Sequence, residues 1–412
     1  MTRYYQILTM PRWLFAFLFL LAVSSAALLA ATPPTFHKDV EPILQSRCQA
    51  CHRPGEAAPM ALLNYQQARP WAKAIRAAVL SGKMPPWQAD PHFGKFSNDL
   101  SLTSAEKQTL TAWVDGGALE GDPAEAPAPR TFPVGWRIPK PDVVFETPDE
   151  FQVPAQGAID YQYISVPTHF TEDKWVEIAE VRPSNRSVVH HAIVMVDEIG
   201  DGHGQEYLAG YAPGMMPQIW KPGQARLIRA GSSLVFQMHY TTNGKPAKDR
   251  TRIGLIFAKS PPAERVGSME VMAPWMTLPP GEADIPITAA LTMREPVRLM
   301  GIRPHMHLRG KSFEVRAVYP GGETETLLSV PKFNFDYQPY YYLETPKLLP
   351  RGTRIECLAV YDNSTSNPRN PDPSATVTWG PQTWDEMMIG WLDVGVPVGV
   401  GWSARGEIRV LE

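Results

Sequence analysis

Proline accounts for 42 of the 412 residues, which is roughly twice its usual share of about 5%. Proline has no backbone N–H and interrupts helices, so a chain this rich in it favours short strands joined by tight turns. After residue 141, short runs of Val, Ile, Phe and Tyr alternate with Pro, Gly and Asn, a pattern typical of β-sandwiches. The clearest strands are expected over residues 188–196, 233–241, 299–307 and 353–361.

The stretch before residue 121 has helical patterns instead. Apolar residues recur at helical spacing over residues 36–44, and a second helix is expected from Pro70 to Gly82. Thr103 and Glu106 have the spacing of a capping box, so a third helix is expected to begin there. This part of the chain is therefore predicted to be all-α.

The length of the chain exceeds that of one ordinary domain. Residues 123–129 alternate Pro with Ala and Glu, a composition that forms extended linkers. We predict a multidomain chain in which a small all-α domain precedes two all-β, jelly-roll-like sandwiches. The expected divisions are an N-terminal segment over 1–31, the α domain over 32–121, a linker over 122–141, and sandwiches over 142–280 and 281–412.

The charge pattern and the N-terminus bear on location and partners. A formal charge of −3 without a dense Lys/Arg run lacks the footprint of nucleic-acid binding. Arg3 and Arg12 precede an apolar run over residues 13–31 that becomes rich in small residues, as in a secretory signal. The alternative is a retained membrane anchor, because the run is close to the ~20 residues that span a bilayer. Both readings put the folded part in the periplasm or on the outer face of the cytoplasmic membrane.

The motif Cys48-Gln49-Ala50-Cys51-His52 has the spacing of c-type haem attachment. The two thiols form thioethers with the porphyrin, and the imidazole of His52 reaches the iron. We therefore expect a covalent haem c and a cytochrome c domain over residues 32–121. Met84, between a helix end and Pro85-Pro86, is the expected sixth ligand. The competing ligands are Met60, His37 and His92.

The remaining cysteine, Cys357, lies in an apolar strand-like run. We interpret it as a buried hydrophobic residue rather than a reactive thiol. No intramolecular disulfide is expected, because the other two cysteines belong to the haem motif.

His305 and His307 are two residues apart in a predicted strand, so their side chains share one face. Met387 would add a thioether, and two imidazoles with a thioether suit Cu(I) better than zinc, which more often takes a carboxylate or thiolate. Met306 is expected to point away from this face. Met388 is the alternative sulfur ligand, since neighbouring strand residues face opposite ways.

His190 and His191 are adjacent, and His239 lies on another predicted strand. Three imidazoles suit copper that cycles between Cu(I) and Cu(II). Neighbours on a regular strand diverge, so His190 and His191 can share a metal only if the backbone twists or both rings rotate back. We expect two copper ions per chain in all.

Four stretches carry these ligands: Val189-His190-His191-Ala192-Ile193, Phe236-Gln237-Met238-His239-Tyr240, His305-Met306-His307-Leu308-Arg309-Gly310-Lys311 and Asp385-Glu386-Met387. In this order they resemble the copper motifs of the copper type II, ascorbate-dependent monooxygenases. That family includes peptidylglycine α-hydroxylating monooxygenase and dopamine β-monooxygenase. The resemblance covers about residues 142–412, and the haem part is an addition similar to that of cytochrome-fused bacterial members.

The resemblance implies that one copper, bound by His190, His191 and His239, transfers electrons. It implies that a second copper, bound by His305, His307 and Met387, activates O2 for insertion of one oxygen atom into a C–H bond of a small-molecule substrate. Relatives take electrons from ascorbate, whereas the fused haem here is expected to receive them from an external donor. Two rival hypotheses are a non-enzymatic haem and copper electron-transfer or copper-binding protein, and a cupin-like dioxygenase built on His305 and His307.

Two departures from the family concern the substrate. An Asn and a Tyr follow the copper Met of the peptide-hydroxylating relative, and Ile389 and Trp391 stand at those positions here. A peptide substrate is therefore not expected. Arg303 does match that relative's Arg-x-His-x-His pattern, and the resemblance implies that it holds a substrate carboxylate. The competing interpretation of Arg303 is a surface arginine before Pro304.

Overall fold

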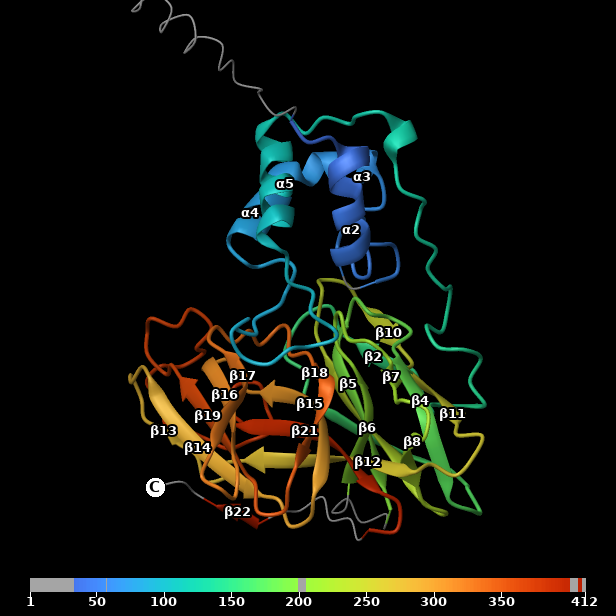
Figure 1. Cartoon of the computed structure of the whole chain (residues 1–412), viewed down its shortest axis with the longest axis vertical. Coiled ribbons are helices and arrows are strands. Elements are labelled where there is room, and N and C mark those ends of the chain that lie inside the picture. Colours follow the sequence, from blue (N-terminus) through green and yellow to red (C-terminus); the bar gives the residue numbers. More distant parts are fainter. Residues whose placement is uncertain (1–32, 57, 199–204, 401–406, 410–412) are drawn as a thin grey trace, which may run out of the picture.

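The computed structural model describes residues 33–56, 58–198, 205–400 and 407–409. The predicted signal or anchor segment over 1–31 and His203 lie outside this part. Figure 1 shows a small helical part at one end of the molecule and a larger β-rich part at the other. Within the described ranges, none of the helices combines the length and the apolar character needed to cross a membrane.

The three predicted helical stretches are all helical. The elements are η1 (Phe36–Val40), α2 (Glu41–Arg47), α3 (Tyr65–Ala68), η2 (Arg69–Trp71), α4 (Ala72–Leu80), α5 (Ser104–Asp115) and η3 (Pro123–Glu125). The capping box is confirmed, because the Thr103 hydroxyl accepts the Glu106 N–H at 3.1 Å and the Glu106 carboxylate accepts the Thr103 N–H at 2.7 Å. Phe36, Leu44 and Trp113 are fully buried in the core of this part.

The β-rich part is built around one long sheet of nine strands. Its path is β1 (Val143–Glu146), β11 (Arg252–Phe257), β4 (Lys174–Arg182), β8 (Gln224–Ile228), β12 (Glu264–Met272), β21 (Ile389–Pro397), β15 (Val297–His305) and β18 (Tyr341–Leu349), with β7 (Gln218–Ile219) beside β4. β12 pairs with β21 along its whole length, and with β8 in parallel. The long sheet therefore runs without a break from the first half of the β-rich part into the second.

Two shorter sheets cover the two halves of the long one. The first consists of β3 (Gln162–Pro167), β9 (Ser233–Tyr240), β5 (Val189–Asp197) and β6 (Gln205–Tyr211). The second consists of β17 (Thr324–Val330), β16 (Gly310–Val318), β19 (Arg354–Tyr361), β14 (Ile285–Thr292) and β22 (Glu407–Arg409). Two small ribbons pair β10 (Ala247–Asp249) with β2 (Phe151–Val153), and β13 (Thr277–Leu278) with β20 (Val377–Thr378).

Each shorter sheet encloses its own hydrophobic core against the long sheet. One core joins strands such as β4 and β11 to β5 and β9, and the other joins β12, β15 and β21 to β16 and β19. The dominance of sheet agrees with the predicted β-rich fold. Cys357 is 1% exposed and unpaired in the second core, which confirms its predicted role as a buried hydrophobic residue.

A charged pair joins the two halves of the long sheet. Arg226 on β8 donates to the Asp393 carboxylate on β21 at 2.9 Å, and Ser268 on β12 donates to the same carboxylate at 2.8 Å. All three side chains are buried. A hydrogen-bonded ion pair is therefore buried where the two halves of the long sheet meet.

Residues 87–99, which we call the strap, attach the helical part to the edge strand β18. Phe96 bridges to Leu343, and the N–H of Ser97 donates to the Tyr342 carbonyl at 2.9 Å. The ring of Trp87 lies 4.9 Å from that of Tyr341. The helical part is thus docked on the β-rich part through backbone pairing and an aromatic cluster.

Candidate metal centre

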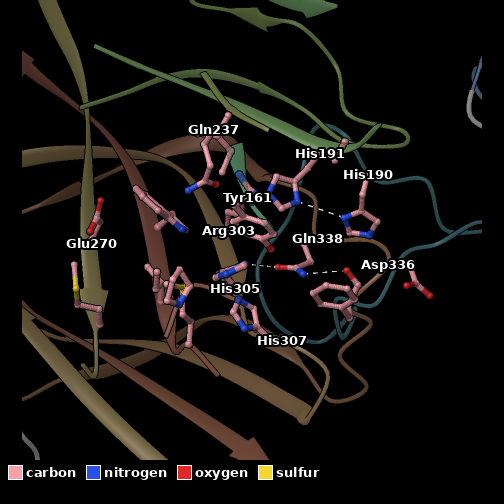
Figure 2. A pocket seen from close by; sticks show the side chains of 18 of the residues that line it. Tyr161, His190, His191, Gln237, Glu270, Arg303, His305, His307, Asp336 and Gln338 are labelled. Atoms are coloured by element: carbon pink, nitrogen blue, oxygen red, sulfur yellow. Dashed lines mark hydrogen bonds between the residues drawn. The ribbon is translucent and has the colours of Figure 1, made fainter. Parts of the chain in front are cut away.

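A cavity of about 230 Å³ lies where the two halves of the β-rich part meet. Figure 2 shows His190 and His191 on one side of it and His305 and His307 on another. Glu270, Trp391 and Arg303 are neighbours on β12, β21 and β15, and they line it in one row. The histidine strands from both halves of the chain thus meet at one cavity.

The first histidine cluster depends on an irregularity in β5. The β5 and β9 register shifts between Val189 and His191, and His191 then lies opposite His239. This irregularity is the backbone distortion that two adjacent histidines need to face the same way. The Nδ1 atoms of His190 and His191 are 3.3 Å apart, and one ligand atom from each of His190, His191 and His239 lies within 4.8 Å of the others.

This cluster has the protonation state that a metal requires. Burial lowers the pKa of His190, lowers the pKa of His191 well below its usual value, and lowers the pKa of His239 to about 3, with the neighbouring histidines adding to the last two shifts. All three imidazoles are therefore neutral at pH 7, with a lone pair available. The Nδ1 atom of His239 is buried and has no hydrogen-bond partner. A buried nitrogen without a partner is costly, and a metal bound at this atom would satisfy it.

The second cluster contains His305 and His307, whose ring centroids are 5.2 Å apart. β15 ends at His305, so the prediction that the strand continues to His307 is wrong. The backbone beyond the strand end turns instead, because the Gly310 N–H donates to the His307 carbonyl at 3.3 Å and the turn leads into β16. The two rings nevertheless line the same cavity.

Hydrogen bonds orient both rings of the second cluster. The Gln338 amide nitrogen donates to the carbonyls of Met306 and Phe335, which fixes the amide, so its oxygen accepts from the His305 Nδ1 at 2.7 Å. The His307 Nδ1 lies 3.2 Å from the Asp385 carbonyl. Because both Nδ1 atoms carry hydrogens in these bonds, each Nε2 atom keeps its lone pair. Burial lowers the pKa of His307 to about 4 and that of His305 well below its usual value.

The two candidate sulfur ligands, Met387 and Met388, lie in different environments. Met387 lines the cavity, whereas Met388 is fully buried in the second core. Met306 is also buried in that core, and it points away from the cavity as expected. Tyr361 donates to the Met387 carbonyl at 2.8 Å and so fixes the backbone that carries the thioether.

Glu386 is a carboxylate beside these ligands that the sequence did not single out. It is fully buried and accepts the N–H groups of His307 at 2.8 Å and Arg309 at 2.7 Å. Burial raises the pKa of Glu386 to about 8 against the opposing effect of these bonds. It ties the segment after β15 to the segment before β21, and it is not among the residues that line the cavity.

Arg303 is 7% exposed and lines the cavity, so the interpretation as a surface arginine is wrong. Its guanidinium carbon lies 5.6 Å from the ring centre of Tyr340, and its Nε atom has no hydrogen-bond partner. Trp391 stands beside it on β21, and Ile389 stands beside His305. The cavity wall next to the second cluster therefore combines one buried cation with large apolar side chains.

The haem motif occupies a single turn after α2. The N–H groups of Cys51 and His52 donate to the Cys48 carbonyl at 3.1 and 2.9 Å. Burial raises the pKa of Cys48 to about 12 and also raises that of Cys51, and neither thiol is in a disulfide. The His52 Nδ1 lies 3.2 Å from the Met60 carbonyl, so its Nε2 remains available. The donors present fit a covalently bound haem.

The proposed sixth ligand stays a prediction. Met84 is 38% exposed after α4, and its N–H donates to the Ala78 carbonyl at 3.2 Å. Among the competitors, His37 bonds to the Glu41 carboxylate at 2.9 Å and His92 to the Asp90 carboxylate at 2.6 Å. Both histidines are therefore engaged in surface or partly buried hydrogen bonds.

Comparisons with known proteins do not name a family. No family model matches the chain, and no curated protein matches it. Among solved structures, the major capsid protein P2 from bacteriophage PM2 aligns with 63% of this chain and 100% of that one, at 10% identity and a TM-score of 0.31. An infectious bursal disease virus structure of the Gx strain aligns with 68% of this chain and 78% of that one, at 9% identity and a TM-score of 0.19. Scores this low support no conclusion about fold or function.

Proposed function

We propose that this protein is an exported, copper-dependent monooxygenase that hydroxylates a C–H bond of a small molecule with O2. The observation that carries the proposal is that two clusters of neutral histidines meet at one cavity, which four of their rings line, and that a buried Nδ1 in the first cluster has no partner. The four sequence motifs that resemble those of the copper type II monooxygenases contain these histidines and Met387.

The donor sets favour copper over other metals. His190, His191 and His239 form an all-imidazole set, and His305, His307 and Met387 combine imidazole with thioether. Zinc sites more often include a carboxylate or a thiolate, and the nearby Glu386 is bonded to backbone N–H groups instead. Copper held in these two places would supply one-electron transfer and O2 activation.

The side chains of the cavity would hold and orient the substrate. Arg303 offers a buried cation with an unpartnered Nε, which suits a carboxylate or another small anion. Trp391 and Ile389 make the adjacent wall apolar. We therefore propose a small substrate with an anionic group at Arg303 and an apolar body whose C–H bond lies near Met387.

The helical part would deliver electrons. Its Cys48, Cys51 and His52 suit a covalent haem c, in a cytochrome c domain over residues 32–121 that is reduced by an external donor. The signal-like segment at the N-terminus, or its retention as a membrane anchor, would put this chemistry in the periplasm or on the outer face of the cytoplasmic membrane. Haem attachment of this type supports that location.

The test is oxygen uptake by the copper-loaded, haem-reduced chain with a panel of small aromatic and aliphatic carboxylates, followed by mass spectrometry with isotopically labelled O2. We expect at least one product that carries a single labelled oxygen atom. Met387→Leu should abolish it, whereas Met272→Leu, a matched change on the same cavity wall, should not. Tight copper binding without a labelled product from any compound would favour the rival copper-binding or electron-transfer protein.

A further inference from the structure

The segment Phe335–Gln338 between β17 and β18, which we call the junction loop, contacts both histidine clusters and lies beside the haem motif. It is held in shape by its own hydrogen bonds, in which the Tyr337 N–H donates to the Asn334 carbonyl at 3.1 Å and the Gln338 amide donates to the Phe335 carbonyl at 3.0 Å. None of its residues belongs to the motifs that suggested metal binding. The junction loop therefore connects the candidate sites through residues that are not themselves candidate ligands.

Tyr337 lies beside the haem motif, with Gly214 next to both. Gly214 has a φ of +81°, and a Cβ atom added there would lie 2.9 Å from the Tyr337 ring and 3.7 Å from the Cys51 sulfur. The tyrosine ring and the cysteine thiol therefore both lie beside the backbone of Gly214. Cys51 would hold the haem through a thioether, so Tyr337 lies beside one of the residues that would bind the porphyrin.

Phe335 forms the contact with both histidine clusters. Its ring stacks on His190 with centroids 5.3 Å apart and an interplanar angle of 16°. The same ring meets His307 edge-on at 6.2 Å. Gln338, three residues further on, fixes the ring of His305. Phe335 thus contacts one histidine of each cluster. In the sequence, only Asp336 separates it from Tyr337.

Contacts with the helical part fix the segments on both sides of the junction loop, and they also fix the start of β5. The strap residue Asp90 donates its N–H to the Ser329 carbonyl at 2.8 Å, near the end of β17. Asn98 donates to the Tyr340 carbonyl at 2.7 Å, just before β18. Arg186, four residues before His190, forms an ion pair with Glu56 beside the haem motif. The haem motif, the junction loop and β5 are therefore fixed relative to one another in this structure.

We propose that Tyr337 and Phe335 form the path by which electrons pass from the haem edge at Cys51 to the copper site at His190. This inference rests on the proposed function. Each transfer moves one electron, so that ferrous haem becomes ferric and Cu(II) becomes Cu(I), and no bond or proton changes. Electron tunnelling decays more steeply across gaps and solvent than through packed side chains. Tyr337 lies beside the haem motif, Phe335 stacks on His190, and the two residues are two positions apart in the junction loop. Tyr337 and Phe335 act as positioning and coupling residues and are not themselves oxidised.

The test is flash photoreduction of the haem in the full, copper-loaded chain without oxygen. Haem absorbance follows the return of ferric haem, and the Cu(II) electron paramagnetic resonance signal follows copper reduction. We expect Tyr337→Leu and Phe335→Leu each to slow the transfer well beyond the spread between repeat measurements on the wild type. Tyr337→Phe keeps the ring and should retain the rate. Phe333→Leu is the matched control, because Phe333 packs on the second core instead.

Three outcomes separate the inference from the proposed function. Slow transfer in the two leucine variants, with unchanged copper content and unchanged reduction of copper by added ascorbate, supports the path. Equal rates in all variants overturn the path but leave haem-to-copper transfer standing. A wild-type chain that binds haem and two coppers, yet keeps its haem reduced beside oxidised copper, overturns both the path and electron delivery by the haem.

Discussion

His191 on β5 lies directly opposite His239 on β9, and their ring centroids are 5.1 Å apart. The pairing exists because the register shifts next to His191, which also brings His190 to the same side. The first candidate copper site is therefore a property of two neighbouring strands of one sheet. Its ligands need no contribution from the second half of the chain.

Replacement of His239 tests this independence. We expect His239→Ala to remove the copper of the first site and to leave the second site and the haem in place, because His305 and His307 are held by other segments. Loss of a residue that hydrogen-bonds to a ligand weakens metal binding roughly 10–100-fold, and loss of the ligand itself should weaken it more. Metal analysis of the purified variant measures this. His169→Ala is the control, since His169 lies outside both clusters, and loss of both coppers from His239→Ala would contradict the separation of the sites.

Removal of the Gln338 amide tests the orientation of His305. Gln338→Leu keeps most of the side-chain volume but leaves the His305 Nδ1 without its acceptor, so the ring can rotate or change tautomer. We expect copper at the second site to bind about 10–100-fold more weakly, as measured by competition with a chelator. Gln237→Leu removes another cavity amide, which bonds to the Tyr163 hydroxyl instead. Equal weakening in both variants would argue against a specific role for Gln338.

The buried ion pair between Arg226 and Asp393 should hold the long sheet together. Arg226→Met leaves a buried carboxylate without its cation, and such a change costs about 3–5 kcal/mol. The double variant Arg226→Met with Asp393→Leu should recover much of that loss, because neither charge then remains buried. Denaturant unfolding measures both. If the double variant is as unstable as the sum of its single variants, the two charges do not act as a pair.

The capping box should make the stability of the helical part depend on acid pH. Partial burial alone raises the pKa of Glu106, but hydrogen bonds from Thr103 and Arg47 outweigh it and hold the pKa below the usual value of 4.5. A carboxylate with a lowered folded pKa stabilises the fold above its unfolded pKa, and this stabilisation is lost as the pH falls through the folded pKa. Glu106→Gln should therefore lower the midpoint of thermal unfolding at pH 7, followed by haem absorbance. The difference from wild type should shrink below about pH 4.5, and a difference that is constant with pH would contradict this account.

Local signals in the sequence predicted much of the secondary structure. The capping box at Thr103 and the runs that became β5, β9 and β19 each depend on residues close together in the chain. Met387 and Met388 could likewise be assigned opposite environments, because alternation along an extended chain is a local property. The end of β15 at His305 was missed, since a turn beyond it decides where the strand stops.

The relations between distant segments could not be predicted from the sequence. β12 pairs with β21, which lies more than a hundred residues later in the chain. No hydrophobic periodicity in the sequence predicts which two strands pair. Gln338 and the Asp385 carbonyl orient His305 and His307 from other segments, and they carry no pattern of their own. The hypothesis that His190 and His191 share a metal predicted a distorted backbone near them. The position of the distortion is known only from the register of β5 and β9.

The measurement that tests the central claim most directly is the copper and haem content of the full chain after haem maturation and copper loading, combined with the electron paramagnetic resonance spectrum of its Cu(II). The account predicts one covalent haem and two coppers per chain, with at least one copper spectrum showing nitrogen ligands. A chain with one haem and no stoichiometric copper would contradict it, because the two histidine clusters would then have no metal to hold.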